Sequence, residues 1–536
     1  MERAYDAVVV GAGHNGLVAA VLLARAGWST LVLEQAERPG GAVKSGEVTR
    51  PGFVHDLYSM NHNLFLASPF YTAHQKDLQR HGLTYAVSDR PYANAFPDGT
   101  SLRVYQDPAR TVEGLRAHDS LDAEGWEGLS ELFDRFAPAL FSLYAAPVPS
   151  WSAAAGLGTA ARRLRRSGLE EMIRLLLSST RELGDAWFSS REAKAMLACW
   201  GMHLDLGPDV SGGAMFPFLE TFADQQAGMS VVRGGASKMV GALVGMLEEA
   251  GGQLRTDAEV EAIEVDGSGA SGVRLTSGER IVAHRAVVAN VTPTALYERL
   301  LGPAGVPERV RRDARRFRYG PGTMMIHLAL DGPVPWAAGD GLDRFAYVHV
   351  APYVEQLAET YTAAVNGLLP ADPLLVVGQT SAVDSSRAPD GQHVLWVQVR
   401  ALPAGIRGDA MGEIEAREWD SVGEPYASRV MQKLETYAPG LGDRVLDRVV
   451  LTPADLERDN PNLVGGDSLA GSMHLDQNFF LRPLPGFSRY GTAVPKLMHC
   501  GASTWPGGGV NALSGWHVGK QLTENRRTRV RRRLGR

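Results

Sequence analysis

One segment near the start of the chain, Asp6 to Glu34, constrains the fold more than any other. It reads DAVVVGAGHNGLVAAVLLARAGWSTLVLE: an apolar run, a glycine-rich turn, a longer apolar stretch and a second apolar run. This order predicts a buried strand over 7–10, a helix over 17–26 and a second strand over 29–33. The turn has the spacing G-x-G-x-x-G, so the segment predicts a dinucleotide-binding β-α-β unit.

The glycines of this turn have different tasks in such a unit. Gly11 permits the tight turn, Gly13 has no side chain to block a pyrophosphate, and Gly16 lets the helix pack closely on the strand. The N–H groups and the positive dipole end of the helix favour phosphate at the same place. We therefore expect these glycines to bind the cofactor, together with Asn15, which stands between them.

The residues that follow the turn indicate which dinucleotide is bound. Glu34 ends the second strand 18 residues after Gly16, where a carboxylate accepts hydrogen bonds from ribose hydroxyls and repels a 2′-phosphate. NADP is therefore disfavoured. Gly40 and Gly41 follow closely and let the backbone approach the same pyrophosphate. Because no second fingerprint for NAD(P) appears, the sequence predicts one bound dinucleotide, FAD.

The composition narrows the class of protein. A chain of 536 residues is long enough for two domains. Its net charge of −6 gives no case for nucleic acid as a partner. Cys199 and Cys500 form no C-x-x-C pair, which excludes dithiol reductases, and we expect no metal. No apolar run approaches the ~18 residues of a membrane-spanning helix. No signal peptide precedes the first motif, so we expect a cytoplasmic protein.

Strand and helix patterns alternate again after the middle of the chain and near its end. The sequence therefore predicts an α/β fold, with a Rossmann-type FAD-binding domain assembled from the discontinuous segments 1–75, 226–300 and 456–536. The intervening segments, 76–225 and 301–455, are expected to form an inserted α+β substrate domain over the flavin.

Two basic segments leave alternatives open. Four arginines gather in ARRLRRSG, and seven stand among the last eleven residues, RRTRVRRRLGR. They are either solvated surface or a means of attraction to an anionic membrane, which would make the protein peripheral at that membrane. The four arginines of the first segment are Arg162, Arg163, Arg165 and Arg166.

The chain resembles the phytoene desaturase-like flavoproteins, and among them the branch of pyridine nucleotide-disulphide oxidoreductase domain-containing protein 2 and its bacterial relatives. The resemblance covers nearly the whole length. It rests on GAGHNGL and ERPGG near the start, RGGASKMVGAL at 233–243, VDSSRAPDGQHVLWVQVRALP at 383–403, and the most specific stretch, LVGGDSLAGSMHLDQNFFLRPLPGFSRYGTAVPKLMHCGASTWPGGGV at 463–510.

The resemblance implies a FAD-binding domain with an inserted substrate domain, and a flavin that meets its substrate between them. Family members oxidise or isomerise polyenes and other lipophilic molecules. Val260 is expected to touch the adenine half through its backbone. The glycine-rich loop near the end of the chain is expected to contact the flavin through Gly501, Ala502, Gly509, Val510 and Asn511.

Dehydrogenation requires a group that takes a proton, in addition to the flavin that takes the hydride at N5. We expect this chemistry near His55, Tyr58 and His62, where such flavoproteins turn from the pyrophosphate towards the isoalloxazine. Trp505, where relatives often have a histidine, is expected to shape the pocket. Arg482 either holds the fold or orients a polar substrate end. His203, His474 and His517 are further candidate bases, each of which also has a purely structural interpretation.

The leading hypothesis is an FAD-dependent oxidoreductase that desaturates a carbon–carbon bond of a lipophilic small molecule, such as a polyene or isoprenoid. Its electrons would pass to flavin N5 and then to O₂ or a quinone. One alternative is oxidation of an amine or alcohol in a biosynthetic intermediate. Others are a redox-neutral isomerase and a flavin-loaded binding protein with little turnover.

Overall fold

The computed structural model describes residues 3–302, 305–351 and 353–524. The β-α-β unit that the glycine turn predicts is formed by β1 (Arg3–Val10), α1 (His14–Arg25) and β2 (Thr30–Leu33). β1 and β2 are parallel neighbours, with Val9 opposite Val32. Their apolar runs are buried, as expected for parallel strands inside an α/β domain.

In the described part of the chain, this unit belongs to a seven-stranded sheet of order β10-β11-β12-β1-β2-β9, with β20 beside β12. β10, β11 and β12 are antiparallel, and the remaining pairs are parallel. The added strands are β9 (Gln253–Arg255), β10 (Val260–Asp266), β11 (Gly269–Leu275), β12 (Arg280–Ala289) and β20 (Leu497–His499). They come from separate stretches of the chain, which confirms a Rossmann-type domain built from discontinuous segments.

A second sheet, also of seven strands within the described residues, has the order β19-β13-β17-β16-β14-β6-β7. Its pairs are antiparallel except for β6 and β14. The strands are β6 (Tyr92–Ala95), β7 (Ser101–Val104), β13 (Gly322–Leu330), β14 (Tyr347–Val350), β16 (Leu374–Gly378), β17 (His393–Leu402) and β19 (Val445–Leu451).

The shorter strands form two-stranded pairs. They are β3 (Ser45–Gly46) with β4 (His55–Asp56), β5 (Tyr85–Ser88) with β8 (Met229–Val232), and β15 (Leu368–Leu369) with β18 (Gly408–Asp409). The segments that form these sheets follow the order expected for the two domains, and the exact domain limits stay a prediction.

The first half of the chain supplies nine α-helices besides α1, within the described residues. They are α2 (Asn63–Leu66), α3 (Pro69–Arg80), α4 (Pro108–His118), α5 (Ser120–Tyr144), α6 (Trp151–Leu177), α7 (Thr180–Trp187), α8 (Arg191–Met202), α9 (Met215–Ala227) and α10 (Ser237–Glu249). The second half adds α11 (Glu308–Arg315), α12 (Val354–Val365), α13 (Thr380–Val383), α14 (Trp419–Tyr437), α15 (Leu441–Arg444), α16 (Pro453–Asp459) and α17 (Leu513–Thr523).

Several helices begin where the sequence offers a capping residue. The Ser68 hydroxyl accepts from the Tyr71 N–H at the start of α3, and Pro69 occupies the first helical position. At α7, Ser179 and Glu182 form a reciprocal capping box, which satisfies two N–H groups at once. These caps fix the first turns of α3 and α7.

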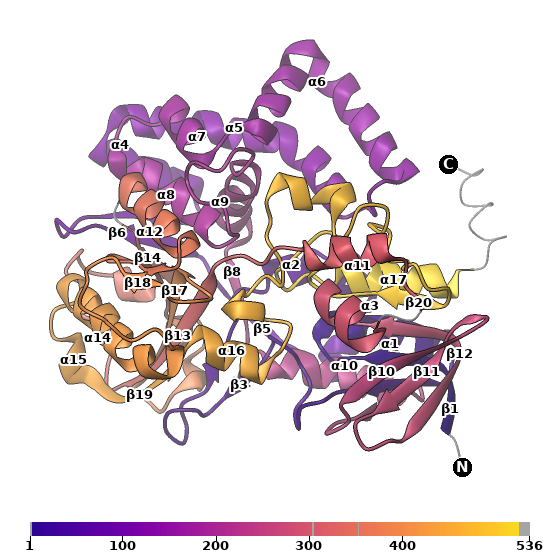
Figure 1. Ribbon diagram of the computed structural model, residues 1–536. Coiled ribbons are helices and arrows are strands. Elements are labelled where there is room, and N and C mark those ends of the chain that lie inside the picture. Colours follow the sequence, from indigo (N-terminus) through magenta and orange to yellow (C-terminus); the bar gives the residue numbers. More distant parts are fainter. Residues whose placement is uncertain (1–2, 303–304, 352, 525–536) are drawn as a thin grey trace.

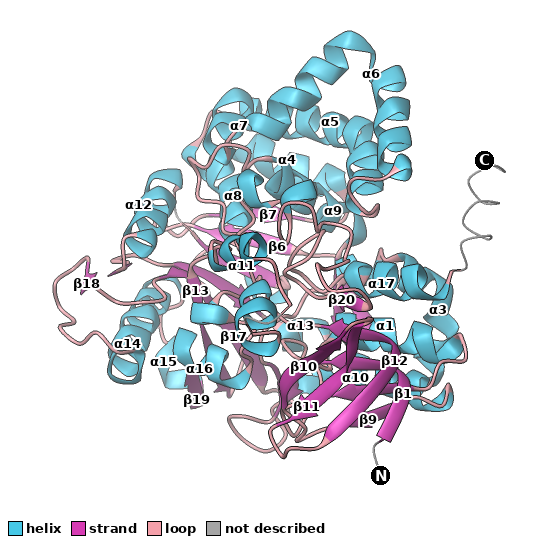
Figure 2. Cartoon of the chain, turned by 45° about the vertical axis from the view of Figure 1, so that its right-hand side comes forward, coloured by secondary structure: helices cyan, strands magenta, loops and turns pink. Residues whose placement is uncertain are grey.

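The two sheets and the helices of the first half of the chain meet in the middle of the molecule. In both views α5, α6 and α7 lie at the opposite end from β10, β11 and β12 (Figure 1, Figure 2). α1 packs between α10 and α17, and their apolar faces form one core beneath the first sheet. The largest core joins the helical end to the second sheet and contains Trp126, Trp200 and Trp396.

The described helices include none that is long and apolar enough to cross a bilayer. Of the two basic segments, residues 526–536 lie outside the described residues, and so do the side chains of Arg163, Arg165 and Arg166. Arg162 is exposed on α6. A membrane role for these segments stays a prediction.

Candidate active site

The glycine turn has the geometry that its sequence requires. Gly11 has φ +93°, a left-handed conformation that glycine adopts without strain, and its N–H donates to the Leu33 carbonyl at 2.7 Å. A Cβ on Gly16 would lie 2.4 Å from the Gly11 carbonyl oxygen, so no larger residue fits there. No side chain of a described residue caps the N-terminus of α1, which begins after Gly13. The helix end is therefore available to an anionic group.

The second glycine pair lies against the first turn. The Gly40 N–H donates to the Ala12 carbonyl at 3.0 Å. A Cβ on Gly41, whose φ is +60°, would lie 3.3 Å from the Gly13 Cα. The two glycine segments thus form one backbone-lined groove, as the sequence predicts.

Glu34 stands at the carboxyl end of β2, with both carboxylate oxygens hydrogen-bonded to backbone. One oxygen accepts from the Ala12 N–H at 2.8 Å and the other from the Ala36 N–H at 3.0 Å. Glu34 and Val260 both line a narrow cavity that begins at Gly11 and Gly13. The carboxylate therefore stabilises the glycine turn through these hydrogen bonds. It also lines the cavity in which we expect a ribose.

A larger cavity of about 240 Å³ continues from this groove into the junction between the sheets. It shares several lining residues with the narrow cavity: Gly13, Gly41, Asn290, Val291, Asn460 and Asn462. Gly501, Ala502, Gly509 and Val510 line the larger cavity. Their contact with the flavin stays a prediction. The two spaces together form an elongated site that runs from Glu34 to the second sheet.

Asn511 and Asn15 act at the edge of this site. The Asn511 side chain accepts from the Leu513 N–H at 2.9 Å and so starts α17, and Asn511 is not a lining residue of the cavity in the described structure. Asn15 lines the cavity and accepts from the Gly515 N–H at 3.1 Å, which ties α1 to α17.

Three asparagines that sequence reasoning missed form the floor between the two cavities. The Asn290 amide donates to the Gly11 carbonyl at 3.2 Å. The Asn462 amide donates to the Asn290 carbonyl at 3.3 Å, and the Asn460 side chain accepts from the Asn462 N–H at 3.2 Å. Asn290 could have been found from the sequence, because it directly follows the apolar run AVVA. This run is the end of β12, which lies beside the glycine turn.

Tyr58 lies in the cavity, as predicted, and is held as a hydrogen-bond donor. Its hydroxyl donates to the Asp459 carboxylate, which also accepts from the Lys44 ammonium at 2.8 Å. Burial and this carboxylate raise the pKa of Tyr58 above its ordinary value. Tyr58 therefore keeps its proton and is unsuited to take one from a substrate.

The structure does not bring His55 and His62 to the cavity. His55 is buried beside Thr49, with 2.8 Å between its Nε2 and the Thr49 hydroxyl, and its ring packs edge-on against His327. His62 is fully buried against Tyr85 and makes no hydrogen bond through either ring nitrogen to a described residue. Burial lowers the pKa of His55 to about 4 and that of His62 to about 3. The expected placement of the base in this segment is thus wrong, because both rings point into the core.

Trp505 is also off the cavity. Its indole N–H donates to the Ala146 carbonyl at 2.8 Å, and its ring stacks on Phe479 with 5.0 Å between centroids. It is 1% exposed and packs with Val148 and Ala153. Trp505 therefore packs the glycine-rich loop against the segment that joins α5 to α6. Its expected place in the pocket wall is wrong, because its ring is buried in this contact.

Of the remaining candidate residues, only His203 lines the cavity, and Arg482, His474 and His517 do not. Arg482 is fully buried and donates to the carbonyls of Ser472 at 2.8 Å and Ala502 at 2.9 Å, so it holds the loop. His517 contacts the Ala145 carbonyl, and His474 lies outside the cavity. His203 lines the cavity, with its Nε2 3.0 Å from Nε2 of His349. In the described chain no cluster of His, Cys, Asp and Glu could hold a metal ion.

The cavity contains a carboxylate that sequence reasoning missed. Glu220 is half-buried on α9 and lines the cavity, and its side chain has no hydrogen bond or ion pair to a described residue. One turn further, Asp224 accepts from the Asn61 and Asn63 amides, the latter at 2.7 Å. Desolvation and the like charge of Asp224 raise the pKa of Glu220 to about 8. Such a carboxyl group is ionised in part near neutral pH and more fully as the pH rises towards 8, and its ionised form can accept a proton.

Comparisons with known proteins agree with this architecture. The chain matches the model of a family described as flavin containing amine oxidoreductase over residues 16–439. It is 31% identical over 557 residues to pyridine nucleotide-disulfide oxidoreductase domain-containing protein 2 of Rattus norvegicus, with 96% of this chain and 92% of the relative covered. It is 25% identical over 527 residues to phytoene desaturase (neurosporene-forming) of Cereibacter sphaeroides, with 95% and 92% covered.

Among solved structures, wild-type putrescine oxidase bound to putrescine matches with a TM-score of 0.63. The identity is 18%, and the match covers 98% of this chain and 99% of that one, so the likeness is one of fold. Together, the comparisons confirm the expected resemblance to phytoene desaturase-like flavoproteins and the expected FAD.

Proposed function

The chain belongs to the family of flavin-containing amine oxidoreductases, and from this premise we propose that it dehydrogenates a carbon–carbon bond of a lipophilic small molecule. Its cofactor is FAD. The observation that carries the proposal is the cavity that continues directly from the dinucleotide groove. The exposed surface of this cavity is mostly apolar, although polar side chains also line it, and the half-buried residue Glu220 is one of them.

The described residues fit FAD along the whole groove. The pyrophosphate would lie at the uncapped N-terminus of α1, against Gly11, Gly13 and Gly41. There is no room for a side chain at Gly13, because a Cβ there would lie 2.9 Å from the Asn290 amide nitrogen. Glu34 would accept from the ribose hydroxyls, with Val260 beside the adenine half. The flavin half would lie against Gly501, Ala502, Gly509 and Val510. When bound, FAD supplies the hydride acceptor.

The apolar walls favour a lipophilic substrate body. Such walls exclude water from the reacting carbons and gain about 25 cal/mol for each Å² of apolar surface that they cover. The phytoene desaturase relative acts, by its name, on an apolar polyene. The side chains that form these walls include Val43, Met60, Leu64, Leu204, Leu463 and Leu469.

Glu220 is the group we assign to take the proton in dehydrogenation. The bond between two carbons becomes a double bond when one carbon gives up a hydride and its neighbour gives up a proton. Of the groups considered for this task, Tyr58 is a committed donor, and His55 and His62 lie away from the cavity. His203 lines the cavity, and burial together with the neighbouring His349 holds its pKa well below the ordinary value, which makes it a weak base. Glu220 faces the cavity with no hydrogen-bond partner among the described residues, so its carboxylate is available to a substrate. We assign O₂ or a quinone as the final electron acceptor, since the sequence has no second dinucleotide fingerprint.

Anaerobic reduction of the FAD-loaded protein tests the proposal. The panel contains cyclic and linear terpenes, polyenes, primary amines and alcohols, and the products are analysed by mass spectrometry. The proposal predicts bleaching of the yellow flavin absorbance by a terpene or polyene, with a product two hydrogens lighter that has a new C=C bond. Reduction only by an amine, with an imine or carbonyl product, would establish an amine oxidase instead. A rearranged product of unchanged mass would establish an isomerase.

A further inference from the structure

The wall of the cavity opposite the dinucleotide groove contains a buried cation with no carboxylate partner. Arg400 on β17 is 5% exposed and lines the cavity. Its guanidinium donates to the carbonyls of Met202 and His203 and to the hydroxyls of Thr323 and Ser468, with the Met202 contact at 3.1 Å and the Ser468 contact at 2.6 Å. These four bonds use four of its five N–H groups, and every acceptor is neutral. In the described chain no carboxylate lies within ion-pair distance of it.

Another buried arginine shows how this chain satisfies such a charge when no ligand is involved. Arg387 is fully buried and forms ion pairs with Asp56 and Asp384, each at 3.0 Å. Burial of a charge is costly, and a carboxylate partner can offset part of that cost. Arg482 is also fully buried and donates only to carbonyls, so such a partner is not obligatory in this chain. Arg400 differs from both of these arginines because it lines an open cavity with one N–H group unused, and that group can donate to a ligand there.

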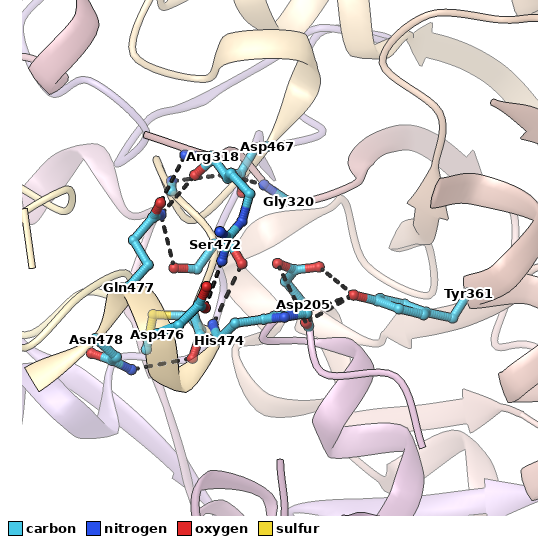
Figure 3. Close-up of polar contacts among 12 residues, drawn as sticks. Asp205, Arg318, Gly320, Tyr361, Asp467, Ser472, His474, Asp476, Gln477 and Asn478 are labelled. Carbon is cyan, nitrogen blue, oxygen red and sulfur yellow. Dashed lines mark hydrogen bonds and ion pairs between the residues drawn. The ribbon is translucent and has the colours of Figure 1, made fainter. Parts of the chain in front are cut away.

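The carboxylates closest to Arg400 are already used elsewhere. Asp205 and Asp467 border a small gap that Arg400 also lines. Asp467 accepts from the N–H groups of Gly320 at 2.9 Å and Gly471 at 2.7 Å. Asp205 accepts from the Tyr361 hydroxyl at 3.2 Å, and Figure 3 shows both carboxylates turned to these donors. The negative charges of Asp205 and Asp467 favour the charged form of Arg400 from beyond ion-pair distance. Neither carboxylate accepts from the remaining N–H group of Arg400.

The same face of β17 presents a second unsatisfied polar group. Gln398 and Arg400 are two residues apart, so their side chains lie on one face of the strand, and both line the cavity. Gln398 is 8% exposed, and its side-chain amide makes no hydrogen bond with a described residue. An anion in the cavity that accepts hydrogen bonds would satisfy the donors of Gln398 and Arg400 together.

We infer that the cavity binds a substrate with a carboxylate at one end, which accepts from Arg400 and Gln398. The inference rests on the proposed function and names its substrate class: a lipophilic carboxylic acid whose apolar body lies between the carboxylate end and the reacting carbons. The fifth N–H of Arg400 and the Gln398 amide offer donors to the two carboxylate oxygens.

Binding to the FAD-loaded protein tests the inference without turnover, because a ligand near the flavin shifts its absorbance spectrum. The probes are matched acids and alcohols of rising length, from butanoate and butanol to geranate and geraniol. We expect at least one acid to bind about tenfold or more tightly than its alcohol, as fits one charge-assisted hydrogen bond. In Arg400→Gln this preference should fall to about one, and in Gln398→Leu it should fall in part. Arg318→Gln, a change at an exposed arginine, should leave it intact.

Several outcomes would overturn the inference. No acid preference anywhere in the series would do so, and so would a preference that survives in Arg400→Gln. If Arg400→Gln fails to fold or to retain FAD, Gln398→Leu decides, because leucine is close to glutamine in size and cannot donate a hydrogen bond. An acid preference in Gln398→Leu equal to that of the unmodified protein would then contradict the inference. The proposed function fails separately: acid-selective binding without a new C=C bond contradicts the function alone. Dehydrogenation of neutral substrates without acid preference contradicts this inference alone.

Discussion

The side-chain amide of Asn290 donates to the Gly11 carbonyl at 3.2 Å, and this bond joins the ends of β12 and β1 under the glycine turn. A Cβ on Gly13 would lie 2.9 Å from the same amide nitrogen. The cofactor groove therefore depends on two segments that are 279 residues apart in the chain.

Gly13→Val is expected to abolish FAD retention, because a branched side chain would occupy the pyrophosphate position and press on Asn290. The measurement is the flavin absorbance of purified protein per mole of chain. Gly241→Ala is a matched control, since a Cβ at this position on α10 meets nothing within 4 Å. Full flavin content in the Gly13→Val protein would show that this turn is not the cofactor site.

Glu34→Ala is expected to weaken FAD binding by roughly 1.5–3 kcal/mol, the usual loss when one partner of a charged hydrogen bond is removed. The change also removes the acceptor of the Ala12 N–H, so the turn should loosen even in the apoprotein. Titration of apoprotein with FAD measures the affinity. An unchanged dissociation constant would contradict the role given to this carboxylate.

The pH dependence of stability should change in Glu220→Gln. The pKa of Glu220 is raised to about 8 in the folded chain against 4.5 as the ordinary value, so the folded state binds more protons than the unfolded state between these values. This contribution is fully present below pH about 4.5 and is lost as the pH rises towards 8. Relative to the unmodified apoprotein, Glu220→Gln should therefore gain melting temperature from pH 5 to pH 8. Parallel melting curves of the two proteins would contradict the raised pKa.

Trp505→Ala is expected to destabilise the protein by about 3–5 kcal/mol, the range for removal of a large buried aromatic side chain. Trp505→Phe should cost less, because it keeps the ring that stacks on Phe479 and loses the bond to Ala146. Chemical denaturation measures both changes. Since Trp505 does not line the cavity, substrate preference should remain that of the unmodified protein, and a changed preference would show that it does reach the substrate.

The cofactor half of the site could be predicted from sequence because its requirements are local. The turn from Gly11 to Gly16 and the acid at Glu34 lie within one β-α-β unit, and backbone geometry fixes their spacing. The later loop from Gly501 to Val510 was placed by family resemblance, and the described cavity includes its expected flavin contacts except Asn511.

The substrate half could not be predicted in the same way, because it is assembled from distant elements. Glu220, Gln398 and Arg400 come from α9 and β17, and no short motif relates these elements. The positions of His55 and His62 along the chain suggested the active site, yet their side chains point into the core. Sequence position gave the approximate location of the backbone and could not give the direction of the side chain.

Glu220 takes a proton while the FAD-loaded protein dehydrogenates its substrate, under the function proposed above. The most direct measurement is the single-turnover rate of anaerobic flavin reduction by the fastest substrate of the panel, followed against pH, in the unmodified protein, Glu220→Gln and His55→Gln. The account predicts a rate that rises with pH towards about 8 as Glu220 loses its proton, and a new C=C bond in the product. In Glu220→Gln the rate should fall by about 10²–10⁴-fold and lose this pH dependence, while His55→Gln retains both. Equal rates in Glu220→Gln and the unmodified protein would contradict the account.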